Sequence, residues 1–110
     1  VQLFGMDAYQ WGTEEDFMAQ FDFGLNLMTE FVKDHPMLIA VTECGRVNSD
    51  IPDWWTRVFH PIASKYPICY CLPWRNAAKE HFGASKDAPT AEDFIKFYNE
   101  DNTLFLKEIL

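Results

Sequence analysis

Residues 37–43, MLIAVTE, constrain the fold more than any other part of the sequence, because they begin as an unbroken apolar run. A strand with one wet face would alternate apolar and polar side chains, whereas an unbroken run is typical of a parallel strand covered on both faces. Two flanking segments, 1–9 and 68–74, also have strand character. Parallel strands need long crossover connections, so we expect helices between these three strands.

The segments between the predicted strands show helical spacing. Residues 14–33 predict a helix with Thr13 as its N-cap and a stripe of regularly spaced apolar side chains. These are Phe17, Phe21, Leu25, Met28 and Val32. A second helix is predicted from Pro52, with a kink at Pro61 and at least one of Trp54 and Trp55 in the core.

The last third of the sequence predicts a long loop and a final helix. Residues 76–89 carry Gly, Pro, Ser and Asp, as loops do. Thr90 and Asp93 resemble a capping box for a helix that contains Phe94, Phe97 and Tyr98. The tail, 103–110, is predicted to form a short helix or turn that packs back on the domain.

The predicted order is therefore β-α-β-α-β-loop-α, which is an α/β fold built from parallel βα units. Each unit takes about 37 residues, similar to the unit size of a (β/α)8 barrel. A complete barrel needs roughly 250 residues, so 110 residues cannot supply one.

The charge balance excludes some partners. The sequence has 17 acidic and 9 basic side chains, a net charge of −8, and so no nucleic-acid partner is expected. No run of 18 apolar residues is present, so no membrane span is predicted. The chain opens at Val1 without an initiator Met or a signal peptide, and we expect a processed or excised start.

The cysteines and histidines do not predict a metal centre. Cys44, Cys69 and Cys71 are expected to be buried free thiols, since an odd number with this spacing is a weak zinc signal. The histidines show no ligand spacing, and metal binding is not expected.

Polar and aromatic side chains follow the apolar part of each strand: Asp7, Tyr9, Thr42, Glu43, Trp74, Arg75 and Asn76. The carboxyl ends of parallel strands share one rim, which is where α/β barrels place their active sites. One carboxylate, a phenol, a guanidinium and aromatic rings suit a sugar site.

Structural interpretations of the same residues stand beside this one. Glu43 could be a salt-bridged structural carboxylate, and Asp7 and Tyr9 could be turn residues. Trp11 could be either a platform at the rim or a cover over the barrel mouth.

The motifs taken together have a family likeness. In order they are D-A-Y-Q, A-V-T-E-C-G, W-W-T, L-P-W-R-N, a late H-F and D-F-x-x-F. This series resembles glycoside hydrolase family 26, whose best-known members are endo-β-1,4-mannanases, and the resemblance covers essentially all 110 residues.

The resemblance implies a (β/α)8 TIM barrel, of which residues 1–110 would be the C-terminal portion, about strands 6–8 with their helices. It implies that Glu43 is the nucleophile and that Tyr9 donates a hydrogen bond to it. Asp7 would line the same cleft, Trp74 would form the aromatic floor under the sugar, and Arg75 would hold the next sugar. The acid/base glutamate would lie upstream of Val1.

The implied activity is retaining hydrolysis of mannan, galactomannan or glucomannan, with no metal or organic cofactor. The implied location is secreted, either extracellular or periplasmic, and the remainder of the barrel would come from the N-terminal part of a parent chain. With one of two carboxylates and open strand edges, the 110 residues alone are expected to fold poorly and to be inactive.

Two departures and several alternatives remain open. Pro73 stands where an aliphatic residue is commoner in the family, and Cys44 adjoins the nucleophile position. The same family also acts on β-1,3-1,4-glucan and β-1,3-xylan. A non-catalytic carbohydrate-binding domain, or a βα domain whose rim residues are incidental, would be the non-enzymatic interpretation.

Overall fold

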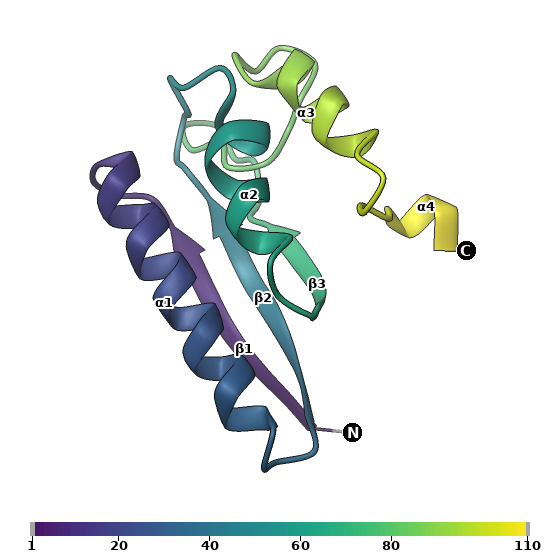
Figure 1. The fold of residues 1–110 in the computed structure, drawn as a ribbon. Helices are drawn as coiled ribbons and strands as arrows, with labels where there is room; N and C mark the ends of the chain where they lie inside the picture. Colours follow the sequence, from purple (N-terminus) through teal and green to yellow (C-terminus); the bar gives the residue numbers. More distant parts are fainter. Residues whose placement is uncertain (1, 110) are drawn as a thin grey trace.

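The computed structural model describes residues 2–109, which form three parallel strands in the order β1-β2-β3. The strands are β1 (Gln2–Tyr9), β2 (Met37–Gly45) and β3 (Ile68–Pro73). The helical segments are α1 (Glu14–Val32), η1 (Trp54–Phe59), α2 (His60–Ala63), α3 (Ala91–Tyr98) and α4 (Leu106–Ile109). Strands and helices alternate along the chain as predicted (Figure 1). The predictions at Val1 and Leu110 fall outside the described residues.

Helix α1 forms as its sequence predicts. The Thr13 hydroxyl accepts a hydrogen bond from the Asp16 N–H at 3.1 Å, and acidic side chains occupy the first turn, where the helix dipole favours them. Phe17, Phe21 and Leu25 lie one turn apart and are buried against the sheet. The periodic apolar stripe therefore becomes the face that α1 packs into the core.

The core is aromatic and lies between the sheet and the helices. Trp54 and Trp55 are both only 1% exposed, so the prediction that at least one is in the core is confirmed. Phe59 stacks on Phe21 with ring centroids 5.3 Å apart, and Trp55 stacks on Phe97 at 5.6 Å. Large aromatic side chains bury 150–250 Å² each, and these packed rings join α1, η1 and α3 into one unit.

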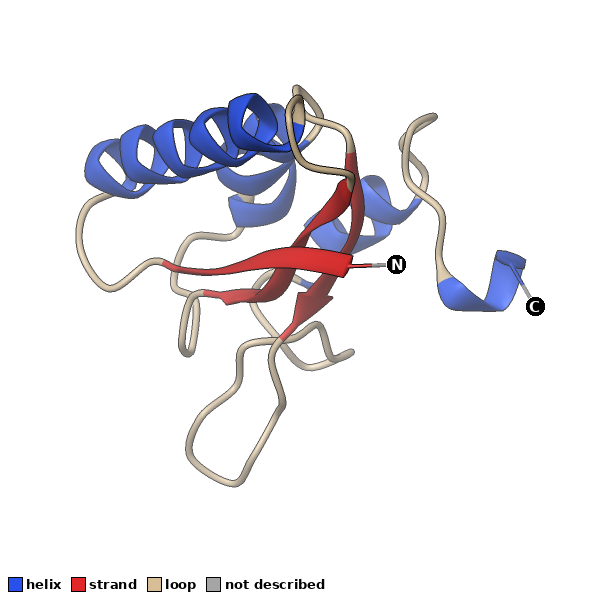
Figure 2. Cartoon of the chain, turned by 90° about the horizontal axis from the view of Figure 1, so that it is seen from below, coloured by secondary structure: helices blue, strands red, loops and turns tan. Residues whose placement is uncertain are grey.

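The expectation that the strand formed by the apolar run is covered on both faces is wrong for the part of the chain that the structure describes. Helices α1 and α2 lie on one side of the strands, and the other side faces away from them (Figure 2). Within residues 2–109, four large apolar side chains on that second side are 45–50% exposed: Leu3, Leu38, Tyr70 and Leu72. This chain therefore covers one face of β2 rather than two, and we call the second side the open face.

The second helix differs from its prediction. It begins at Trp54 rather than Pro52, and its first part, η1, is a π-helical turn in which the His60 N–H donates to the Trp55 carbonyl five residues earlier. Pro61 lies in the first turn of α2, where its missing N–H costs least. The expected kink is therefore a change of helix type just before the proline.

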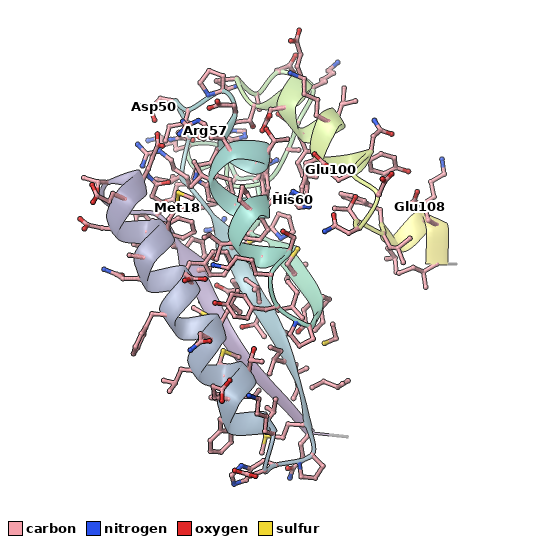
Figure 3. The ribbon with its side chains drawn as sticks, in the orientation of Figure 1. Met18, Asp50, Arg57, His60, Glu100 and Glu108 are labelled. Carbon is pink, nitrogen blue, oxygen red and sulfur yellow. The ribbon has the colours of Figure 1, made fainter. Side chains whose placement is uncertain are left out.

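Polar contacts tie η1 and α2 to the rest of the chain. Arg57 pairs with Glu14 at the start of α1 and with Asp53 at 2.8 Å. His60 lies on the side of the helix that faces the C-terminal segment, where its Nε2 is 2.7 Å from Asn102 Oδ1 (Figure 3).

The predicted capping box at α3 does not form. Thr90 precedes the helix but makes no side-chain capping hydrogen bond. The Asp93 carboxylate instead accepts hydrogen bonds from the backbone N–H of Thr56, at 3.0 Å, and from the Thr56 hydroxyl. The buried carboxylate of Asp93, in α3, therefore binds the first turn of η1 instead of capping its own helix.

The three cysteines are free thiols as predicted, but the prediction that all three are buried is wrong. All three thiols are free, but only Cys44 is buried, while Cys71 is half-buried and Cys69 is exposed. β3 is the last strand of the sheet formed by residues 2–109, which leaves Cys69 without a covering strand.

The tail forms the predicted short helix, α4. Phe105, just before it, packs on Tyr98 with ring centroids 4.5 Å apart, whereas no residue of α4 is buried. The expectation that the tail packs back on the domain is therefore confirmed for Phe105 and wrong for α4. Across residues 2–109, no helix has both the length and the apolar composition needed to span a membrane. The same residues contain no group of three or more metal-ligating side chains.

Candidate active site

Tyr9 and Glu43 form a direct pair at the carboxyl ends of β1 and β2. The Tyr9 hydroxyl donates a hydrogen bond to Glu43 Oε2 at 2.7 Å, although the two residues are 34 positions apart. Both side chains are half-buried. The rim predicted from the order of the elements therefore brings the phenol and the carboxylate together.

A β-bulge in β2 sets the direction of the Glu43 side chain. Met6 pairs with Val41, but the next residue of β1, Asp7, pairs with Glu43, so Thr42 is the extra residue. A bulge re-aims a side chain without ending the strand. If Thr42 instead paired regularly with Asp7, Glu43 would pair with Ala8, whose side chain faces the core.

The extra residue also fixes the neighbouring carboxylate. The Thr42 hydroxyl donates to Asp7 Oδ1 at 2.8 Å. The Thr42 methyl group lies over Gly5, where any β-carbon would collide with it. Asp7 is thus held beside the Tyr9–Glu43 pair on the open face.

The surroundings of Tyr9 keep its phenol protonated. Partial burial, the hydrogen bond to Glu43, and the negative charges of Glu43 and Asp7 all raise the pKa of Tyr9 well above its ordinary range. The hydroxyl therefore stays protonated, and remains a hydrogen-bond donor, at neutral pH. That donor occupies Oε2, and among residues 2–109 no hydrogen bond to Glu43 Oε1 is present.

An aromatic group surrounds Tyr9. Trp11 stacks on the Tyr9 ring with centroids 5.7 Å apart, and Phe82 meets the same ring edge-on at 5.4 Å. Trp11 is 71% exposed, so it presents a free indole face at the rim, whereas Phe82 is buried. The indole face is of the kind that packs against a pyranose ring.

Trp74 and Arg75 begin the loop that follows β3. The Trp74 N–H donates to the Cys44 carbonyl at 2.8 Å, which places its backbone beside the residue after Glu43. Arg75 is exposed and lies 3.7 Å from Glu80 in its own loop. Among residues 2–109, no hydrogen bond or ion pair joins either side chain to Tyr9 or Glu43.

A separate cavity lies away from this rim. It has a volume of about 410 Å³, and Arg46, Trp54, Phe82 and Thr90 are among the residues that line it. None of the five predicted site residues does so. Phe82 borders both this cavity and the Tyr9 ring, so it separates the cavity from the rim.

Gly5 and Phe82 shape the rim although neither was predicted to lie there, and Thr42 was predicted only as a polar residue at the end of its strand. Gly5 gives no signal in the sequence, because its need for a bare α-carbon arises from Thr42 on the next strand. Phe82 stands in the late H-F motif, but nothing local shows that it reaches Tyr9. Thr42 follows the apolar run, where strict strand alternation would have turned it away from Glu43.

The fold and the rim together define a class of protein. Parallel βα units with a paired carboxylate and phenol at the carboxyl ends of adjacent strands are typical of barrel enzymes, whose catalytic groups come from those ends. One face of the sheet is packed by helices and the other carries large apolar side chains, as in a section of a barrel wall.

Solved structures identify the family within that class. A glycoside hydrolase family 26 β-mannanase from Bacteroides ovatus matches 97% of this chain with a TM-score of 0.92 and 32% sequence identity. A modular family 26 endo-β-1,4-mannanase from Cellulomonas fimi matches 100% of it with a TM-score of 0.79 and 26% identity. A family 26 protein from Muricauda has a TM-score of 0.81 over 92% of this chain at 19% identity, which is evidence of fold alone.

The resemblance to glycoside hydrolase family 26 is therefore confirmed, and these residues match part of the family's solved structures. This chain covers 32%, 27% and 29% of those three structures, about a third of their length. No family model matches the sequence, and no curated protein matches it.

Proposed function

We propose that residues 1–110 are the C-terminal portion, about strands 6–8 with their helices, of a (β/α)8 glycoside hydrolase domain. The open face supports this proposal, because barrel interiors are filled by bulky side chains from every strand. Leu3, Leu38, Tyr70 and Leu72 are such side chains, and within residues 2–109 nothing covers them fully. The remaining strands of the barrel would complete that coverage.

The proposed activity is retaining endo-β-1,4-mannanase activity on mannan, galactomannan or glucomannan. The observation that carries it is the 2.7 Å hydrogen bond from Tyr9 to Glu43 at the carboxyl ends of adjacent strands. The mannanases of Bacteroides ovatus and Cellulomonas fimi support the substrate class. Because such polymers cannot enter cells intact, we propose a secreted, extracellular or periplasmic, location.

In the proposed mechanism, Glu43 Oε1 attacks the anomeric carbon and forms a glycosyl ester. The bond to the leaving oxygen breaks as an acid glutamate from outside this segment gives that oxygen its proton. In retaining enzymes the two carboxyl groups are about 5–5.5 Å apart. The same glutamate then takes a proton from water, whose oxygen displaces Glu43 and restores the original configuration.

The other rim residues have binding roles in this proposal. Tyr9 holds Oε2 and so orients Oε1 towards the sugar, and Asp7 lines the same cleft. Trp74 supplies an apolar floor. Arg75 binds hydroxyl groups of the next sugar. Its present partner, Glu80, is exposed, so breaking that ion pair costs little.

Replacement of Glu43 tests the nucleophile in the complete protein that contains these residues. Glu43→Ala should lower turnover on mannan by several orders of magnitude, because no covalent intermediate can form. Azide added to this variant with an activated β-mannoside should restore turnover and give the α-mannosyl azide. A β-azide product would identify Glu43 as the acid/base residue instead, and near-normal turnover would contradict the proposal.

Two controls accompany that test. Glu80→Ala, an exposed glutamate of the loop after β3, should leave turnover within a few-fold of the parent. Assays on mannan, lichenan and β-1,3-xylan in parallel should show the highest rate on mannan. The 110 residues alone, with one carboxylate of the two, should show no hydrolysis.

A further inference from the structure

Asn48, in the loop after β2, has an unusual backbone and joins distant parts of the chain. Its φ of 46° lies in the left-handed region, which asparagine tolerates better than most residues. The loop turns back at this residue towards the segment that follows β3.

Asn48 binds that segment with its backbone and its side chain. Its N–H donates to the His81 carbonyl at 2.7 Å, and its Oδ1 accepts from the His81 N–H at 2.9 Å. Its Nδ2 donates to the Lys79 carbonyl at 3.0 Å. One residue thus pairs with a segment more than 30 positions away, much as a neighbouring strand would.

The pairing fixes the position of the next residue, Phe82. This side chain is buried and meets the rings of Tyr9 and Trp11 edge-on, at 5.4 and 6.2 Å. Its β-carbon also lies where Gly45 leaves room, since a β-carbon at Gly45 would come within 3.0 Å of it. Phe82 therefore fits between the end of β2 and the Tyr9 ring.

We propose that Asn48 is a positioning residue for the Tyr9–Glu43 pair. It holds the loop after β3 against the end of β2, so that Phe82 supports the ring of Tyr9 and the phenol meets Glu43. Asn48 touches neither residue of the pair and acts through Phe82. The inference rests on the proposed function, because it assigns Asn48 a part in the same reaction.

The test compares variants of the complete protein. Asn48→Gly keeps the left-handed backbone accessible but removes the amide, and its kcat on mannan should fall by about 10- to 100-fold, as misplaced catalytic groups do. Asn48→Asp keeps the Oδ1 acceptor and should retain more activity than Asn48→Gly. Asn99→Gly is the matched control, because among residues 2–109 the Asn99 side-chain amide bonds only to the Ile95 carbonyl of the preceding helix, and the kcat of this variant should not change.

A double-mutant cycle separates positioning from general stability. If Asn48 acts through Tyr9, adding Asn48→Gly to Tyr9→Phe should lower kcat by no more than about 2-fold, because the interaction is already lost. Losses that multiply, or an unchanged kcat in Asn48→Gly, would overturn the inference. If Asn48→Gly fails to fold, Phe82→Leu takes its place in the cycle with the same two outcomes.

The controls also separate this inference from the proposed function. An inactive Glu43→Ala variant together with losses that multiply in the cycle would reject the role of Asn48 alone. An active Glu43→Ala variant would reject the nucleophile and the role of Asn48 with it.

Discussion

On the helix side of the sheet, Ile39 and Val41 are completely enclosed, whereas on the open face their neighbour Leu38 is half exposed. The three residues come from one apolar run, so the sequence makes no distinction between the two faces. The difference arises because α1, η1 and α2 pack on one side. An apolar run thus indicates how buried its side chains are in the complete fold, even where the covering surface comes from another part of the protein.

The enclosed face should show the largest loss of stability. Trp55→Ala in the complete protein should lower the free energy of unfolding by about 3–5 kcal/mol, because it leaves a cavity between η1 and α3. Chemical denaturation measures this loss. Trp11→Ala, at the exposed rim, is the matched control and should cost less than about 1 kcal/mol.

The open face gives the sharper test, because its side chains should be as buried as those of the enclosed face in the complete protein. Leu38→Ala should then lower the free energy of unfolding by about 2–5 kcal/mol, the usual cost of truncating a buried leucine. Ile39→Ala, the next residue on the enclosed face, is the reference. A loss below about 0.5 kcal/mol for Leu38→Ala alone would mean that the open face stays in water, and would contradict the barrel.

The smallest expected effect concerns pH and the attachment of α1 to the turn before β3. The Tyr66 hydroxyl donates to Asp22 Oδ1 at 2.6 Å, and this bond, with burial and the charge of Asp22, raises the pKa of Tyr66 to about 12. A raised pKa gives stability that is complete below the unfolded value, near 10, and is lost as the pH rises through about 12.

The stability difference between the parent and Tyr66→Phe should therefore be constant from pH 7 to 9 and shrink between pH 10 and 12. Urea denaturation across this range measures it. Asp22→Asn should weaken the same pH dependence, because a neutral amide oxygen is a weaker acceptor and the charge of Asp22 is gone. A difference that does not change up to pH 12 would contradict the assignment.

Features set by local spacing were predictable. The stripe of α1, the three strands and the order of elements follow from periodicity, and the order alone placed Tyr9 and Glu43 on one rim. The motif resemblance added the family, which the solved structures confirm. The roles of all five candidate site residues remain predictions: Asp7, Tyr9, Glu43, Trp74 and Arg75.

Features set by contacts between loops were not predictable. Asp93 was expected to cap its own helix, but it binds Thr56 on a helix 37 positions earlier. The hydrogen bonds between Asn48 and His81 join two loops that are distant in the sequence, so they form only when both loops are in place. The prediction that Cys69 is buried was wrong, because the sequence does not show that β3 lies at an edge of the sheet formed by residues 2–109.

The bulge at Thr42 divides β2 into two parts with different tolerance to mutation. Up to Val41, a substitution alters the packing of the sheet and should change the free energy of unfolding. From Thr42 to Glu43, two successive side chains serve the open face, and changes there should alter chemistry while leaving the fold intact. Cys44 returns to the core, so the chemical part is two residues long and bounded on both sides by residues that the fold requires.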